Sequence, residues 1–282
     1  MISLKKVLVL ATAIISLVLL PNEINKEKSN KKYLSEIQES QPVKRDYDLF
    51  ILDPGHGGID SGATQKRVRE DEINYDVVVR LNRILTDKGY LVHQTVYDST
   101  TKFEPQEKLR RGNDEGLVDK EKNFLPLTKR MLYERAEIIN SFSDKNPLLV
   151  SVHTNSTREE VSGTSIYYPS QIIYDKKEWE DNSKKLAIEI EKSFEKNKIP
   201  LYSMGFLGFK FPLERIRDII RDDENFKIVI FKKTNLETKI LIECGNLKNP
   251  DDFLRLKDPK ERQKIADAIA EGLINYTNNS KI

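Results

Sequence analysis

A regular pattern of apolar and polar positions begins near residue 49. Residues 49–52 form a short apolar run that stops at Asp-Pro-Gly, which predicts a buried strand ending at a loop. The next apolar positions recur every four residues and predict the buried face of a helix: Ile73, Val77, Leu81 and Leu85. Gly89 ends that helix, and residues 90–96 predict a second strand.

The rest of the chain repeats this alternation. Further strands are predicted at 148–152, 163–168, 226–231 and 239–242. Helical spacing of apolar residues predicts helices over 132–139, 180–197 and 260–277, with inward positions at Leu186, Ile190, Phe194, Ile265, Ile269 and Leu273. Residues 98–126 are polar and contain Gly and Pro, so we expect a surface insertion. This order indicates an α/β fold with a mostly parallel or mixed central sheet flanked by helices, in a single domain with a long insertion.

The N-terminal segment has a different pattern. Lys5 and Lys6 precede an uncharged run over 7–20 that stops at Pro21, as in a secretory signal. We therefore expect residues 1–21 to be a signal peptide or a membrane anchor, and the protein to be exported. Residues 22–46 are polar with almost no apolar periodicity, which predicts a linker, and the folded domain is expected to start near Tyr47.

Composition narrows the range of partners and sites. Apolar residues make up 38% of the chain and charged residues 33%, enough for a core under a heavily charged surface. The net charge of +2 gives no field that would attract nucleic acid, so no nucleic-acid partner is expected. The single cysteine, Cys244, excludes an intrachain disulfide and a cysteine-rich zinc site.

Three segments place reactive side chains after predicted strands. They are LDPGHGGIDSGA at 52–63, SVHTNS at 151–156 and IECGNLKNP at 242–250, which carry His56, His153 and Glu243. The carboxyl ends of strands in open α/β sheets are where ligands bind. Two imidazoles and one carboxylate would make a zinc site with a fourth position open for water, and Glu70 is the best candidate for the carboxylate.

Each of these residues also has a structural explanation. A histidine after a strand is often a hydrogen-bonded structural residue, and Glu70 can simply oppose the dipole at the start of its helix. Glu243 can pair with a surface cation. His93 lies within a predicted strand, and we interpret it as structural.

Taken together, the motifs resemble the zinc-dependent N-acetylmuramoyl-L-alanine amidases of the type-3 amidase family. The matching segments are DPGHGGIDSGA at 53–63, EDEIN at 70–74, YERAEIIN at 133–140, SVHTNS at 151–156 and IECGNLKNP at 242–250, followed by RQKIADAIAEGL at 262–273. They occur in the family's order along residues 49–276.

The resemblance implies one Zn²⁺ per chain, held by His56, Glu70 and His153, with Glu243 as the catalytic glutamate. It implies a catalytic domain over 47–278 with insertions at 98–126 and 169–238. The expected reaction is hydrolysis of the amide bond between N-acetylmuramic acid and L-alanine in peptidoglycan. This substrate agrees with an extracytoplasmic location (periplasmic, cell-wall or secreted), whether the N-terminal segment is cleaved or remains anchored in the membrane.

Some departures and alternatives stay open at this point. Asn246, Lys248, Thr154 and Cys244 replace residues that are commoner in the family, and the changes put substrate contacts in doubt rather than metal binding. Cys244 is interpreted as a small packing residue. The alternatives are an inhibited or weak peptidoglycan-binding regulator with the same fold, and a zinc peptidase that acts within the stem peptide. Residues 180–197 belong to the 169–238 insertion. They are either a lid that blocks the site until an activator protein removes it, or one more helix on the sheet.

Overall fold

The computed structural model describes residues 49–98, 100–101, 104–109, 115–126, 130–204, 219–222 and 228–279. The expected signal or anchor (1–21) and the linker (22–46) lie outside these residues. Within the described ranges, every helix is too short or too polar to cross a membrane.

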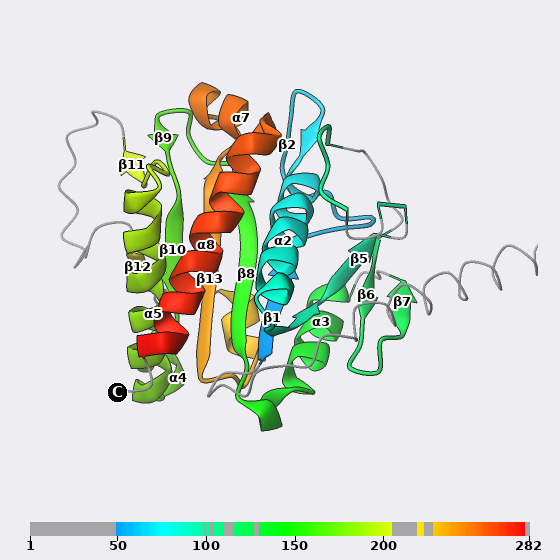
Figure 1. Ribbon diagram of the computed structural model, residues 1–282, viewed down its shortest axis with the longest axis vertical. Coiled ribbons are helices and arrows are strands. Elements are labelled where there is room, and N and C mark those ends of the chain that lie inside the picture. The colour runs from blue at the N-terminus through cyan, green and yellow to red at the C-terminus, as the bar shows by residue number, and fades with distance from the viewer. Residues whose placement is uncertain are drawn as a thin grey trace, which may run out of the picture. The chain divides into compact units, whose positions relative to one another are not determined.

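A six-stranded mixed sheet forms the centre of the fold (Figure 1). Its strand order is β12-β10-β13-β8-β1-β4, and all neighbours are parallel except β10 and β13. The strands are β1 (Leu49–Pro54), β4 (Leu91–Gln94), β8 (Leu148–Asn155), β10 (Ser165–Tyr168), β12 (Ile219–Arg221) and β13 (Thr238–Asn246). The predicted fold class is confirmed.

Three long helices cover one face of this sheet (Figure 1). They are α2 (Glu70–Asp87), α5 (Lys177–Lys196) and α8 (Pro259–Asn279), and α8 contacts both of the others. All the inward positions expected on these helices are fully buried: Ile73, Val77, Leu81, Leu85, Leu186, Ile190, Phe194, Ile265, Ile269 and Leu273. The predictions for these helices are confirmed, as is that for α3 (Met131–Asn140), which buries Ala136 and Ile139.

α5 is a core helix and not a lid. Its side chains pack between α8 and the strands β10 and β13. A removable lid would expose these apolar side chains to water when it opened, at a cost of about 1.5–3 kcal/mol for each one. Of the two interpretations of residues 180–197, the helix on the sheet is confirmed and the lid is wrong.

Residues 98–126 hold strands that the sequence did not predict. β6 (Glu115–Val118) and β7 (Phe124–Pro126) form an antiparallel three-stranded sheet with β5 (Val96–Asp98). The expected strand at 90–96 is divided, because Thr95 separates β4 from β5 and its N–H donates to the Leu52 carbonyl. Strands of three or four residues have too few positions for a period of two to be recognised.

The strand expected at 226–231 is wrong in its described part. Val229–Lys233 forms the short helix α6, which buries Ile230 and Phe231. The buried Lys239 ammonium donates to the Phe231 carbonyl (2.9 Å) and the Thr234 carbonyl (2.6 Å) near the helix end. A side chain from β13 thus satisfies carbonyls that a helix end leaves open, and a short apolar run alone cannot reveal this.

The remaining elements are short and lie mostly in connections. They are β2 (Thr64–Gln65), β3 (Val68–Arg69), η1 (Ser143–Lys145), β9 (Val161–Ser162), α4 (Gln171–Tyr174), β11 (Ser203–Met204) and α7 (Pro250–Lys257). β2 and β3 form a small hairpin that leads directly into α2. The hairpin therefore determines where Glu70, the first residue of α2, is placed.

Three neighbouring parallel strands carry the candidate residues. Pro54, at the end of β1, pairs with Val152 of β8, and Glu243 of β13 pairs with His153 of β8. The side chains of the three segments therefore meet at one edge of the sheet, as the strand order predicts.

Candidate metal centre

His56 stands on a loop that turns sharply out of β1. The loop begins where the Gly55 N–H donates to the Val152 carbonyl (2.8 Å). His56 has a φ of 65°, in the left-handed region that non-glycine residues adopt only where surrounding contacts hold them. Its Nδ1 lies 2.9 Å from Asp60 Oδ2, so Nε2 is left to face Glu70.

A buried arginine on α3 holds the same loop by its backbone. Arg135 donates from Nη2 to the His56 carbonyl at 2.8 Å, and Nη1 lies 2.6 Å from Asp53 Oδ1. Both charged side chains are 2% exposed. Asp53 accepts two further hydrogen bonds, from the hydroxyls of Thr95 and Ser151. Arg135 has no role in the predictions from sequence, although a charged residue next to the inward Ala136 is a usable signal.

Glu70 joins the two histidines. Its Oε1 lies 3.3 Å from His56 Nε2 and 3.2 Å from His153 Nδ1. The other oxygen, Oε2, accepts from the Ala63 N–H at 2.9 Å. One candidate ligand atom from each of the three residues lies within 4.8 Å of the others. The structure thus brings together all three candidate ligands, with His153 inside β8 rather than after the strand.

Two of the three side chains, His56 and Glu70, have pKa values that their surroundings shift. Burial lowers the pKa of His56, but the hydrogen bonds and charges of Glu70 and Asp60 outweigh burial and raise that pKa to about 9. Burial alone would raise the pKa of Glu70, whereas hydrogen bonds from His153 and His56 hold it well below its usual range. Without a cation, Glu70 and Asp60 thus favour the protonated form of the His56 imidazole, and a cation that binds there competes with that proton.

Glu243 lies beside this group on β13. Its Cα pairs with that of His153, and parallel register puts both side chains on the same face of the sheet. Burial raises the pKa of Glu243 to about 7, against the lowering effect of His153. Its buried Oε2 has no hydrogen-bond partner among the described residues. This oxygen is available to exchange a proton with a bound molecule.

The donor set fits a zinc ion. Two imidazoles and one carboxylate are a known ligand set of catalytic zinc, which keeps a fourth position for water. A tetrahedral ion with ligand bonds of about 2.0–2.1 Å separates neighbouring ligand atoms by about 3.3 Å. The distances from Glu70 Oε1 to His56 Nε2 (3.3 Å) and to His153 Nδ1 (3.2 Å) match this value. Asp60 and the Ala63 N–H add the outer hydrogen bonds that orient such ligands.

The backbone at Gly62 leaves no room for a side chain beside these ligands. A Cβ there would lie 2.6 Å from Glu70 Oε2 and 2.7 Å from His56 Cδ2, at a φ of +59°. Gly89 has a similar φ of +78°, but a Cβ there would meet no described atom within 4 Å.

If this centre binds Zn²⁺, as its donor set fits, Gly62→Ala should weaken that binding by at least about tenfold, as other disturbances of ligand orientation do. The matched control, Gly89→Ala, should lose about 1–2 kcal/mol of stability through the same left-handed backbone and bind Zn²⁺ normally. Chelator competition measures the affinity, and thermal unfolding measures the stability. Equal Zn²⁺ affinities in the two variants would show that a side chain at position 62 does not disturb the candidate ligands.

Asn246 is buried, and backbone groups bind its side chain. Its Nδ2 donates to the carbonyls of Arg158 (2.6 Å) and Val161 (2.8 Å), and the residue is 1% exposed. Its Oδ1 accepts from the N–H groups of Thr157 and Lys248. Asn246 therefore supports the loop after β8.

Two residues interpreted as structural are confirmed as such. Cys244 is fully buried, and burial raises the pKa of its thiol to about 12, so it is not a reactive thiolate. A ring nitrogen of His93 lies 2.9 Å from the Val118 carbonyl, and burial lowers the pKa of this imidazole to about 4.

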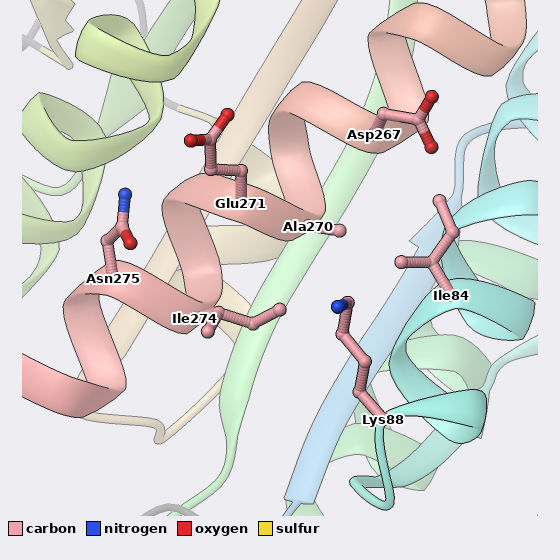
Figure 2. Close-up of a pocket in the computed structure, with 7 residues that line it drawn as sticks. All are labelled: Ile84, Lys88, Asp267, Ala270, Glu271, Ile274 and Asn275. Carbon is pink, nitrogen blue, oxygen red and sulfur yellow. The ribbon is translucent and has the colours of Figure 1, made fainter.

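A pocket between α2 and α8 is separate from this centre (Figure 2). Its volume is about 300 Å³, and it is lined by Ile84, Lys88, Asp267, Ala270, Glu271, Ile274 and Asn275. Ile84 lies in the last turn of α2 and Glu70 in the first, about 20 Å apart at 1.5 Å per residue. The pocket therefore does not belong to the candidate metal centre.

Comparison with known proteins finds a matching family model and similar relatives. A family model described as N-acetylmuramoyl-L-alanine amidase (Amidase_3) matches residues 50–275. The germination-specific N-acetylmuramoyl-L-alanine amidase of Bacillus subtilis is 25% identical over 229 residues, 81% of this chain and 79% of the relative. The N-acetylmuramoyl-L-alanine amidase AmiA of Escherichia coli is 25% identical over 252 residues, 81% of this chain and 75% of the relative.

Solved structures show the same fold. The amidase Ami1 of Mycobacterium smegmatis superposes with a TM-score of 0.60 at 20% identity, over 84% of this chain and 100% of that one. The CwlD amidase of Clostridioides difficile, solved in complex with the GerS lipoprotein, superposes with a TM-score of 0.55 at 26% identity, over 82% of this chain and 99% of that one.

Proposed function

Because the chain belongs to the Amidase_3 family of N-acetylmuramoyl-L-alanine amidases, we propose that it is a Zn²⁺-dependent enzyme that hydrolyses the amide bond between N-acetylmuramic acid and L-alanine in peptidoglycan. The family supports the class of enzyme, a cell-wall hydrolase. The metal and the residue roles rest on the geometry of the centre.

One observation carries the proposal of a metal. His56, Glu70 and His153 come from three separate parts of the chain, yet their ligand atoms lie within 4.8 Å of one another. Three polar groups gathered in this way are costly to bury unless they bind one another or a common partner. Zn²⁺ bound there would supply a polarised water and a Lewis acid for the scissile carbonyl.

The chain's own residues supply the proton transfers and the orientation. We assign Glu243 as the group that accepts a proton from the attacking water and passes it to the amine of L-alanine as that amine leaves. Its Oε2, which has no hydrogen-bond partner in the part of the chain that the structure describes, supports this role. Asp60 fixes the orientation of the His56 ring, so that Nε2 keeps facing Glu70.

The proposal includes a location and a partner. Peptidoglycan lies outside the cytoplasmic membrane, so the proposed site of action is extracytoplasmic. The CwlD relative is solved with a lipoprotein, which supports the proposal that an activator protein binds this chain as well. We place its contact in residues 169–238, outside the core helix α5.

The test is product analysis with the full chain. Incubated with peptidoglycan and Zn²⁺, it should release stem peptides that begin with L-alanine, as mass spectrometry identifies them, and a chelator should abolish the release. His153→Ala should lose this activity. His93→Gln is the control, because it changes a histidine outside the centre.

The other outcomes separate the alternatives. New termini within the stem peptide would make the protein a zinc peptidase. No product from a folded, Zn²⁺-loaded chain would contradict the enzyme and favour a peptidoglycan-binding regulator. The family match favours the amidase over both.

A further inference from the structure

A buried asparagine connects the candidate ligand Glu70 to the loop of His56. Asn74 lies one turn after Glu70 on α2 and is fully buried. Its Nδ2 donates to the Gly55 carbonyl at 3.2 Å and lies 3.4 Å from Glu70 Oε1. One amide group thus supports the carboxylate ligand and the backbone next to the histidine ligand.

This amide works in only one orientation. If it were turned over, its oxygen would face Glu70 Oε1 and the Gly55 carbonyl, which are both acceptors. A carboxamide has donors only on its nitrogen, so the reversed orientation loses both contacts. The two acceptors therefore fix the orientation of the amide, and the amide in turn holds Glu70 Oε1 next to the loop of His56.

Thr154 holds the other end of this amide and also contacts Glu70 directly. Its hydroxyl donates to Asn74 Oδ1 at 2.9 Å, and its backbone N–H donates to Glu70 Oε1 at 3.2 Å. The side chain is 1% exposed, so water does not compete for these groups. Thr154 follows His153 on β8, and alternation along the strand sends its side chain to the opposite face, toward α2.

We infer that Thr154 and Asn74 are a pair of positioning residues that set the orientation of Glu70 in the metal centre. The inference rests on the proposed function for the identity of the metal. The pair touches no substrate and acts through the ligand.

The experiment compares Zn²⁺ affinities by chelator competition on folded, metal-free protein. Thr154→Val keeps the shape and removes the hydroxyl, and it should weaken Zn²⁺ binding by about 10–100-fold, the effect usual for residues that orient metal ligands. Thr154→Ala removes the same hydroxyl and adds no atom, so it serves if the valine variant does not fold. Thr154→Ser restores the hydroxyl and should restore the affinity to within about threefold of the parent.

Thr234→Val is the matched control for loss of a buried hydroxyl. Thr234 is 1% exposed, and its hydroxyl donates to the Ile230 carbonyl, away from the centre. This variant should unfold at a lower temperature and bind Zn²⁺ as the parent does. A purely structural role of Thr154 predicts the same result for Thr154→Val, and this result would overturn the inference.

One further result would also count against the inference. A serine variant as weak as the alanine variant would exclude the hydroxyl as the cause. A parent chain that binds no Zn²⁺ would instead overturn the proposed function, and the two failures are therefore distinguishable.

Discussion

Replacing Glu243 with glutamine should lower the rate of peptidoglycan hydrolysis by about 10²–10⁴-fold and leave Zn²⁺ bound, because the amide cannot accept the proton of the attacking water. The substitution keeps the shape of the side chain. The measurement is the initial rate of release of L-alanine-terminated peptides, together with the Zn²⁺ content of the same sample.

The same variant should not lose stability. In the metal-free protein, burial raises the pKa of Glu243 from 4.5 to about 7. Between these two pH values the unfolded chain has already lost its proton while the folded chain keeps it, so folding weakens as the pH rises. Glutamine does not titrate. Relative to the parent, Glu243→Gln should therefore gain stability from pH 4.5 to 7 and hold a constant advantage above pH 7.

The two measurements together separate catalysis from structure. A slow enzyme that binds Zn²⁺ and is at least as stable as the parent at pH 8 identifies Glu243 as a proton-transfer group. An enzyme that keeps more than about one tenth of the parent rate would contradict this role, since proton transfer by a positioned side chain contributes at least about 10². Loss of Zn²⁺ would mean that Glu243 supports a ligand instead.

The sequence was sufficient for the layers of the fold. Ile73, Val77 and Leu81 recur at helical spacing because one face of α2 must lie on the sheet, and this need is local to the helix. The sequence did not predict α6, because the conformation of this segment depends on a contact with a distant element rather than on a local pattern. Its form depends on Lys239, which reaches the carbonyl of Phe231 from another element.

The candidate ligands were predictable for a related reason. His56 and His153 belong to segments at the carboxyl ends of strands, and parallel neighbours bring those ends together whatever the loops contain. Glu70 was the weaker prediction from the residues alone, because an acidic first turn is also what a helix dipole favours. Only the structure shows its Oε1 between the two imidazoles.

The supporting residues could not be predicted in this way. Arg135 and Asp53 are 82 positions apart, and Asn74 and Thr154 are 80 apart. Their hydrogen bonds depend on how α3 and α2 are placed against β1 and β8, to within a fraction of an ångström. A pattern of apolar positions does not contain that information.

The second large effect is the loss of stability that we expect when Arg135 is replaced. Arg135→Met removes one partner of an ion pair with Asp53 in which both side chains are 2% exposed. An unpaired buried charge costs about 3–5 kcal/mol. At about 2–4 °C for each kcal/mol in a domain of this size, the midpoint of thermal unfolding should fall by roughly 6–20 °C. Differential scanning calorimetry measures the shift.

A surface ion pair provides the matched control. Arg83 and Glu104 approach to 2.8 Å, but their side chains are 52% and 56% exposed. Arg83→Met should therefore cost no more than about 1 kcal/mol. If the two variants unfolded at similar temperatures, the buried pair of Arg135 and Asp53 would contribute no more to stability than a surface pair.

The same substitution should also weaken the metal centre. Arg135 donates to the His56 carbonyl, so its loss frees the loop that carries this candidate ligand. Adding Asp53→Asn to Arg135→Met should recover part of the lost stability, because the stranded charge is gone, but the His56 carbonyl still lacks its donor. Zn²⁺ affinity should therefore stay low in the double variant while its unfolding temperature rises. Recovery of both together would mean that Arg135 acts on the metal centre only through the stability of the fold.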